Sequence, residues 1–317
     1  MPTRRLHMIA AIMLMALMTV SAALAQPTMT EKKGLHLSAR DDLFLYSKIK
    51  DPTAGTFEEN AKVLVDDFYA DAAWYGLKLG DNTSFVPKLS YRIVGFRYKD
   101  WAPTTLQTAI FKPTGLYALK LHLKLRHSFD NGWSITAVGT PGIVSDFRNI
   151  DSDHWKVDAK LLISKMQDAN LTYGIGAILD RRFGEMYVLP AVQLKYKMNE
   201  TSSFNVMAPK YAEYWNQWQK EIAFGLGIWF DGEEFAQGRE IEGQPAIQPK
   251  GNSVRYSVGT VGPMCRYTLP NGWQATGSLG LAFARRYEYY NDATDVTQKY
   301  NLKETLFFRL SVSADVP

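Results

Sequence analysis

The chain has 317 residues and a formal net charge of +4, long enough for one large domain or two small ones. This near balance of charge argues against a dedicated nucleic-acid-binding protein, which would concentrate basic residues on one face. Cys265 is the only cysteine, so no disulfide can form within the chain and an exported fold must be stabilised by other means. No metal-binding spacing is visible, and we expect neither a metal nor a cofactor.

Residues 1–25 have the organisation of a secretory signal peptide. Arg4 and Arg5 give a charged start, the segment from Met8 onward carries no charge, and it ends in Ala23-Leu24-Ala25. A charged region, an apolar region and small residues at the end together predict export and cleavage near Ala25. Cleavage removes two arginines and no acid, so the formal charge falls from +4 to +2. An uncleaved membrane anchor is the alternative.

The remainder of the chain contains no helical membrane span. No apolar run after Ala25 approaches the roughly 18 residues that such a helix needs. The mature chain is therefore either a soluble exported protein or a β-barrel. We expect residues 26–60 to form an N-terminal segment with room for one extra strand, and residues 61–317 to form the main domain.

Alternation of apolar and polar residues predicts β-strands along the whole main domain. In the clearest segment, residues 117–126, Tyr117 and successive leucines alternate with mostly basic residues. The predicted strands are 61–79, 84–98, 115–129, 133–144, 155–166, 170–183, 187–198, 203–212, 216–230, 253–269, 273–289 and 300–314. If residues 203–230 formed a single crossing, residues 36–49 could supply a missing first strand.

The lengths of these segments favour a membrane barrel over a soluble sheet. They run about 10 residues or more, whereas strands of soluble proteins usually have about 5 or 6. Short polar turns alternate with longer loops, and aromatic residues gather at the segment ends, as in outer-membrane barrels. Lipid tolerates no open sheet edge. We therefore predict an all-β fold, a single closed antiparallel transmembrane β-barrel of about 12 strands. The long connection 231–252 breaks the alternation of short and long connections.

Three motifs resemble a family of outer-membrane β-barrel proteins of unknown function. They are the run from Tyr187 to Tyr196, the dipeptide Ala208-Pro209, and the run from Phe283 to Glu288. The resemblance extends from residue 60 to the end of the chain. It implies an outer-membrane barrel and supplies no activity or catalytic residue. One departure is the end of the chain, Ser313 to Pro317, which lacks the terminal aromatic residue of many outer-membrane proteins.

Basic residues gather on the polar face of the alternating segments, which faces the lumen of a barrel. Because basic side chains that line a pore select anions, we interpret this face as the lining of a narrow channel for small solutes, anionic ones among them. A plugged, ion-paired lumen in a purely structural barrel is the alternative. The residues are Lys120, His122, Lys124, Arg126, Lys156, Lys160, Lys195 and Lys197.

Arg181 and Arg285 begin two similar double-arginine steps at the ends of strands. Strict alternation places both on the apolar face, where arginine is tolerated only near the membrane interface. Arginine suits phosphate geometry, so we expect contacts with lipopolysaccharide phosphates. The alternative is an ordinary ion pair with Glu185 and with Glu288 at the rim.

Enzymatic chemistry has little support in the sequence, and we expect the protein not to be an enzyme. Outside residues 1–25 the histidines are His36, His122, His127 and His154. A membrane-embedded lipid-modifying enzyme would be favoured if His154 or His122 contacted a serine at the bilayer rim. A periplasmic or secreted β-sandwich that binds a ligand is a further alternative.

The expected location is the outer membrane of a Gram-negative bacterium. The expected partners are outer-membrane lipid, lipopolysaccharide and the barrel-assembly machinery, without nucleic acid.

Overall fold

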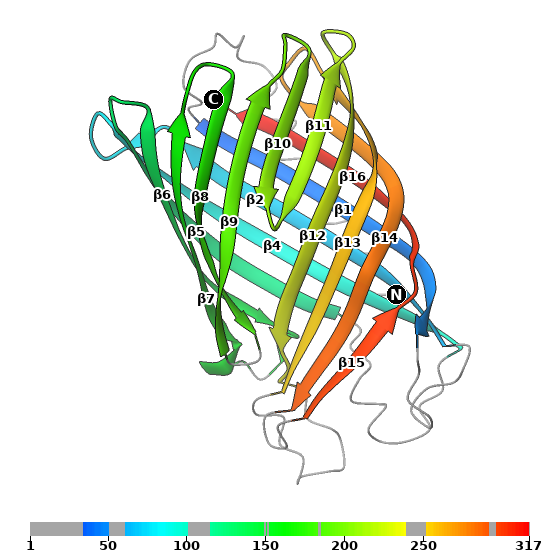
Figure 1. The fold of residues 1–317 in the computed structure, drawn as a ribbon. Coiled ribbons are helices and arrows are strands. Elements are labelled where there is room, and N and C mark those ends of the chain that lie inside the picture. The colour runs from blue at the N-terminus through cyan, green and yellow to red at the C-terminus, as the bar shows by residue number, and fades with distance from the viewer. Residues whose placement is uncertain are drawn as a thin grey trace.

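The chain folds as a closed antiparallel β-barrel (Figure 1). The computed structural model describes residues 34–50, 61–100, 115–148, 150, 152–182, 185–238, 252–291 and 296–316. Residues 1–25, predicted to be a signal peptide, lie outside this range. Among the described residues no helix is long and apolar enough to cross a membrane.

The strands follow the sequence alternation closely, with one short 3-10 turn, Ser152–His154. The first half of the wall consists of β1 Gly34–Lys50, β2 Lys62–Tyr75, β3 Leu77–Lys78, β4 Thr83–Lys99, β5 Gly115–Ser128, β6 Trp133–Ser145, β7 Trp155–Met166 and β8 Leu171–Arg182. The second half consists of β9 Glu185–Lys197, β10 Ser202–Ala208, β11 Tyr211–Gln217, β12 Ile222–Ala236, β13 Asn252–Thr268, β14 Gln274–Asn291, β15 Val296–Leu302 and β16 Thr305–Val316.

The sheet closes through the pairing of β1 with β16, so the first and last strands are neighbours. β3 continues β2 along the edge of β4, and β15 and β16 lie end to end between β14 and β1. With each of these pairs counted as one position, the barrel has fourteen positions. The prediction of about 12 strands was therefore close but too low.

Two regions account for the difference in strand count. β1 contains the strand that was considered for residues 36–49, so the barrel begins before residue 61. Residues 202–236 form three strands where two were predicted, because β10 and β11 are joined at Pro209 and Lys210. The extra strand restores the alternation of connections. The long connection after β12 now reaches the same rim as the one between β6 and β7 (the long-loop rim), and the turns 129–132 and 198–201 mark the opposite, short-turn rim.

The apolar side chains of the alternating segments point outward. Leu119, Leu121, Leu123 and Leu125 on β5 are 37–41% exposed. Trp74, Trp133, Trp155 and Trp218 are also exposed near strand ends, where amphipathic rings are expected in a membrane barrel. The outward leucines and the closed ring exclude the β-sandwich alternative, in which these leucines would lie between two sheets.

Not every aromatic residue near the end of a strand faces outward. Trp215, Tyr287 and Tyr289 are buried inside the barrel, and Tyr69 bonds to carboxylates there. Their place on the inner face follows from strand register, which the position of a residue near a segment end does not reveal.

The inside of the barrel is packed with apolar side chains toward the long-loop rim. Phe96 contacts the rings of Tyr256 and Tyr287 at centroid distances of 5.7 and 5.8 Å. Phe235 on β12 is fully buried in the same cluster. This core joins opposite walls, so the bore is narrowed at this end. The cluster also includes Phe44, Val65, Val94, Leu116, Val144, Val254 and Phe307.

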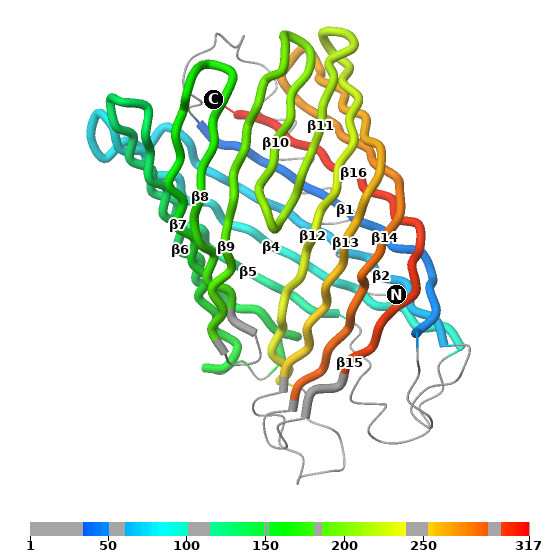
Figure 2. Tube along the Cα trace, in the orientation of Figure 1, coloured from blue at the N-terminus to red at the C-terminus, as the bar shows by residue number. Residues whose placement is uncertain are grey.

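β12 leaves the cylindrical wall at its long-loop end. Its last residue, Ala236, pairs in parallel with Ser145 of β6, and the Asp146 N–H donates to the Ala236 carbonyl at 3.1 Å. The long-loop ends of β7, β8 and β9 therefore lie outside the contact between β12 and β6. Figure 2 shows these three strands at the left of the view, apart from β12.

Candidate functional site in the barrel lumen

The lumen is lined by the polar faces of the strands, and the register brings the predicted basic residues to it. Lys120 on β5 donates to Asp158 of β7 at 3.0 Å and to Glu233 of β12 at 2.6 Å. Glu233 thus reaches from the displaced end of β12 to the opposite wall. Lys120 is consequently neutralised by carboxylates rather than free to bind a solute.

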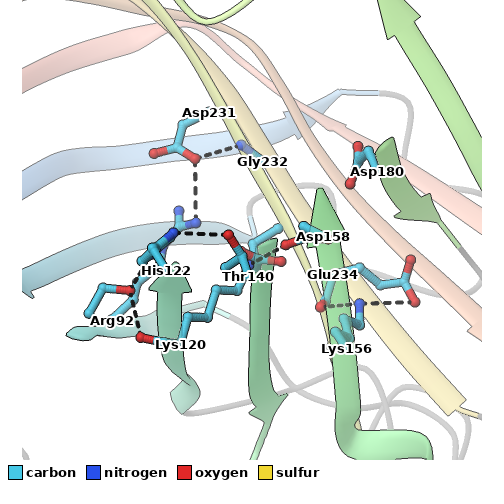
Figure 3. Close-up of polar contacts among 12 residues, drawn as sticks. Arg92, Lys120, His122, Thr140, Lys156, Asp158, Asp180, Asp231, Gly232 and Glu234 are labelled. Carbon is cyan, nitrogen blue, oxygen red and sulfur yellow. Dashed lines mark hydrogen bonds and ion pairs between the residues drawn. The ribbon is translucent and has the colours of Figure 1, made fainter. Parts of the chain in front are cut away.

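A second pair of ionic contacts links the displaced β12–β13 sheet to β7 and β8. Lys156 lies 3.3 Å from the Glu234 carboxylate and also donates to the Glu234 carbonyl oxygen. Arg255 lies 3.8 Å from Asp180. Figure 3 shows Lys156, Glu234 and Asp180 at the place where β12 passes β7 and β8. Lys156 is therefore part of the structure that holds the sheets together.

Arginines and aspartates alternate across the lumen, on the side of the apolar core that faces away from the long-loop rim. Arg92 forms a two-bond fork with Asp67 at 2.7 and 2.9 Å, and its other nitrogen lies 3.4 Å from Asp231. Asp231 also contacts Arg40, which lies 3.3 Å from it. We call this set the Arg–Asp belt: Arg309, Asp42, Arg40, Asp231, Arg92 and Asp67.

The Arg–Asp belt joins β16, β1, β2, β4 and β12, so it bridges the bore. Its charges are balanced, because each guanidinium faces at least one carboxylate. Buried charges require such pairing, since a carboxylate alone in a medium of low polarity is strongly unfavourable. Together with the apolar core, the belt narrows the lumen toward the long-loop rim.

Four cations on the other side of the lumen have no carboxylate partner among the ion pairs of the described residues. Lys124 and Arg126 lie on β5, Lys160 on β7 and Lys195 on β9. Lys124, Lys160 and Lys195 lie close enough for their charges to repel one another. The Lys160 ammonium meets the Met207 sulfur at 3.3 Å. We call this set the cation cluster.

Lys197, the last of the predicted lining residues, lies on the same face of β9 at the short-turn rim, opposite Ser203 of β10. It is exposed and belongs to the mouth of the lumen rather than to its centre.

His122 occupies the middle of β5 and contacts hydroxyl groups on both neighbouring strands. Its Nε2 atom lies 2.8 Å from the Ser90 oxygen and its Nδ1 atom 3.1 Å from the Thr140 oxygen. The ring is thus fixed in place by a serine and a threonine. A serine–histidine contact is one element of a hydrolytic site, but the second nitrogen meets a hydroxyl group where a hydrolase would place an acid or amide.

The prediction that Arg285 faces the lipid was wrong. Its side chain is 1% exposed and donates to Ser47 and to the Tyr256 hydroxyl inside the barrel. The reason is a β-bulge, in which Ala284 and Arg285 together stand opposite Val258. Ala284 has a φ of 46°, in the left-handed region. One extra residue reverses the faces of all residues that follow it.

The side chain of Arg181, the other predicted lipopolysaccharide contact, lies outside the described residues. Its backbone pairs with Met186 of β9. In the described part of the chain no group of three histidine, cysteine or acidic residues could hold a metal ion.

Sequence reasoning did not single out the acidic half of the lumen. Asp67 and Arg92 lie in predicted strands on the inner face, so parity could have placed them in the lumen. Their pairing with Asp231 could not be predicted, because residue 231 was assigned to a loop.

A family model described as "Domain of unknown function (DUF6268)" matches residues 76–315. The search of curated proteins gave no match. Among solved structures, an outer membrane channel from Pseudomonas putida F1 is similar, with 12% identity, a TM-score of 0.44, and coverage of 92% of this chain and 99% of that chain. A FadL homologue from Pseudomonas aeruginosa has 10% identity, a TM-score of 0.43, and coverage of 90% and 91%. The translocator domain of the autotransporter NalP from Neisseria meningitidis has 11% identity, a TM-score of 0.35, and coverage of 98% and 96%.

Proposed function

We propose that this chain, which belongs to the family described as "Domain of unknown function (DUF6268)", is a narrow outer-membrane channel for small anionic solutes. The outward leucine band supports a place in a lipid bilayer. A barrel with an even number of strands is typical of the outer membrane of Gram-negative bacteria.

The cation cluster is the observation that carries the proposal. Lys124, Arg126, Lys160 and Lys195 share one side of the lumen without a carboxylate partner among the described ion pairs, whereas Lys120 and Lys156 are paired. Uncompensated cations in a confined space raise the local concentration of anions and exclude cations. The lumen is therefore suited to an anionic solute.

Reconstitution of the purified protein in planar bilayers tests this function. Under a salt gradient, the reversal potential should show higher permeability to chloride than to potassium. Replacement of Lys124, Lys160 and Lys195 by Gln should move the permeability ratio toward one. Lys165→Gln is the matched control, since this lysine lies on β7 near the short-turn rim and bonds to the Asn131 carbonyl outside the lumen. Absence of conductance, or selectivity that the triple variant leaves unchanged, would overturn the proposal.

A second candidate is a lipid-modifying hydrolase, for which the contact between Ser90 and His122 is the one supporting observation, although it lies in the middle of β5 and not at the bilayer rim. Purified protein should then release fatty acid from phospholipid vesicles, and Ser90→Ala should abolish the release. If wild-type protein and Ser90→Ala are equally inactive, this candidate is excluded.

A further inference from the structure

Among the described residues, the strands between β9 and β12 cover only part of the length of these two strands. The strands between them, β10 and β11, have 7 residues each, whereas a membrane-crossing strand needs about 9–11. Beyond their turn at Pro209 and Lys210, no described strand pairs with residues 186–191 of β9 on this side. Residues 231–235 of β12 likewise pair only with β13. We call these two facing edges the wall seam.

Three backbone groups on the β12 edge of the wall seam have partners outside the β-ladder. Asp231 accepts a hydrogen bond from the Gly232 N–H at 2.8 Å. Lys156 donates to the Glu234 carbonyl, and the Asp146 N–H to that of Ala236. Backbone groups without a partner are strongly unfavourable in lipid. Side-chain partners thus allow β12 to remain separated from β9.

The β9 edge is blunted by a proline. Along β9 the Lys197 N–H points toward β8, where it donates to Asn170, and the Met198 N–H points toward β10, where it donates to Ser202. Because the directions alternate and the β8–β9 register has no shift, residue 190 points toward the open side. Pro190 has no N–H, so this edge lacks a donor at its centre.

The outward side chains around the wall seam are apolar and exposed, as expected of a surface that contacts lipid chains. Val188 on β9 is 66% exposed, Ile175 on β8 is 69% exposed, and Phe230 on β12 is 48% exposed. Cations lie directly behind this apolar rim. Lys160 belongs to the cation cluster, and Lys210 at the tip of the β10–β11 hairpin is close enough to repel it. The wall seam thus joins a lipid-facing apolar border to an uncompensated positive lumen.

We propose that the wall seam is a lateral entry for single-chain amphiphilic anions, such as long-chain carboxylates, between the lipid bilayer and the lumen. The alkyl chain would lie against Leu189 on the inner face of β9, and the head group would bind Lys160 and Lys195. The apolar core and the Arg–Asp belt narrow the direct route from the long-loop rim, whereas the wall seam opens toward the lipid. This inference rests on the proposed function and names the solute class.

The test uses a fluorophore on a single cysteine placed at Leu189, on the inner face of β9 within the wall seam. Cys265→Ala removes the native thiol, and the protein is reconstituted in vesicles. Bromododecanoate should quench Leu189→Cys saturably, while a brominated cationic amphiphile of equal chain length should bind at least tenfold more weakly. Lys160→Gln with Lys195→Gln should weaken bromododecanoate binding at least tenfold. Val188→Cys, which faces lipid, is the matched control and should show only non-saturable quenching. A brominated alkyl phosphate, as a second arm, distinguishes carboxylate from phosphate head groups.

A second variant tests the route itself. Two residues inserted into β10 between Val206 and Met207, and two into β11 between Tyr211 and Ala212, preserve the alternation and lengthen the hairpin along the free edges. Entry of bromododecanoate from the lipid should slow at least tenfold, while the chloride-to-potassium ratio stays that of wild type.

The outcomes separate the two proposals. Equal, non-saturable quenching at residues 188 and 189, with anion selectivity intact, overturns the lateral entry and leaves the channel. Unchanged entry in the lengthened hairpin also overturns the lateral entry. Loss of both saturable quenching and anion selectivity overturns the proposed function. If the lengthened variant does not fold, the comparison of residues 188 and 189 still decides.

Discussion

Arginine side chains at the middle of the lumen are held by carboxylates from several strands. Arg309 forks onto Asp42 at 2.6 and 2.8 Å, and Arg92 does the same with Asp67. Asp42 and Asp67 are 2% and 1% exposed, so both depend on these guanidinium groups for their charge compensation. Removal of one partner of such a pair is strongly unfavourable, because it leaves the other charge buried without compensation.

Arg92→Leu should therefore lower the free energy of unfolding by about 3–5 kcal/mol, since it leaves Asp67 without its partner. The double variant Arg92→Leu with Asp67→Leu should recover most of this loss, because an apolar pair replaces the ion pair and Asp231 keeps Arg40. Urea-induced unfolding in lipid vesicles measures both. A double variant less stable than the single one would show that the ion pair is not the source of the effect.

Substitution of Arg181 should lower the retention of lipopolysaccharide, whereas substitution of Arg285 should leave it unchanged. Arg285 is buried beside Ser47, so Arg285→Gln cannot remove a contact on the outer surface. Arg181→Gln is expected to reduce the lipopolysaccharide that copurifies with the protein, because a guanidinium group suits phosphate. Equal retention by both variants and wild type would remove the proposed contact.

The short β10–β11 hairpin is the unusual element of this barrel, because it leaves parts of β9 and β12 without a neighbouring strand between them. Most strands could be predicted from alternation within a few residues, because long two-sided segments carry a strong period of two. The hairpin could not, since Pro209 and Lys210 form a turn without glycine between segments that both alternate. The bulge at Ala284 was invisible for a similar reason, because one inserted residue leaves composition unchanged and reverses only the phase. Basic residues of the lumen were therefore found, whereas Arg285 was assigned to the wrong face.

Pro190→Val should convert the open β9 edge into one that can pair with another strand. The substitution restores an N–H on the free side, and edges with a full set of donors and acceptors promote association. We expect more SDS-resistant dimer on unheated gels. Pro263→Val is the matched control, because β13 has neighbours on both sides. Equal dimer in the two variants would argue against an open edge at β9.

At the scale of the molecule, side chains of the barrel wall itself narrow the described part of the bore. β12, β13 and β14 lean across the bore, and their side chains complete an apolar core with β1, β2, β4 and β5. The sequence predicts the barrel but not this narrowing, because inward Phe235 and Tyr256 look like ordinary strand residues until β12 is seen to reach β6.

Phe235→Ala should both destabilise the barrel and raise its conductance. The ring is fully buried, and a Phe-to-Ala change in a core lowers the free energy of unfolding by about 3–5 kcal/mol. The cavity also widens the narrowed part of the bore. Single-channel recording beside urea unfolding measures the two effects. A destabilised variant whose conductance equals that of wild type would show that the core does not limit passage.

The contact between the apolar face of the barrel and the bilayer is tested most directly by measuring the environment of each residue along β5. Spin labels on single cysteines at positions 119–126, in a Cys265→Ala background, report access to oxygen in lipid and to a nickel complex in water. We predict a strict period of two, with labels at Leu119, Leu121, Leu123 and Leu125 accessible to oxygen and those at intervening positions accessible to nickel or shielded from both. Labels at the leucine positions that are shielded from lipid would contradict the claim that this face of the barrel contacts the bilayer.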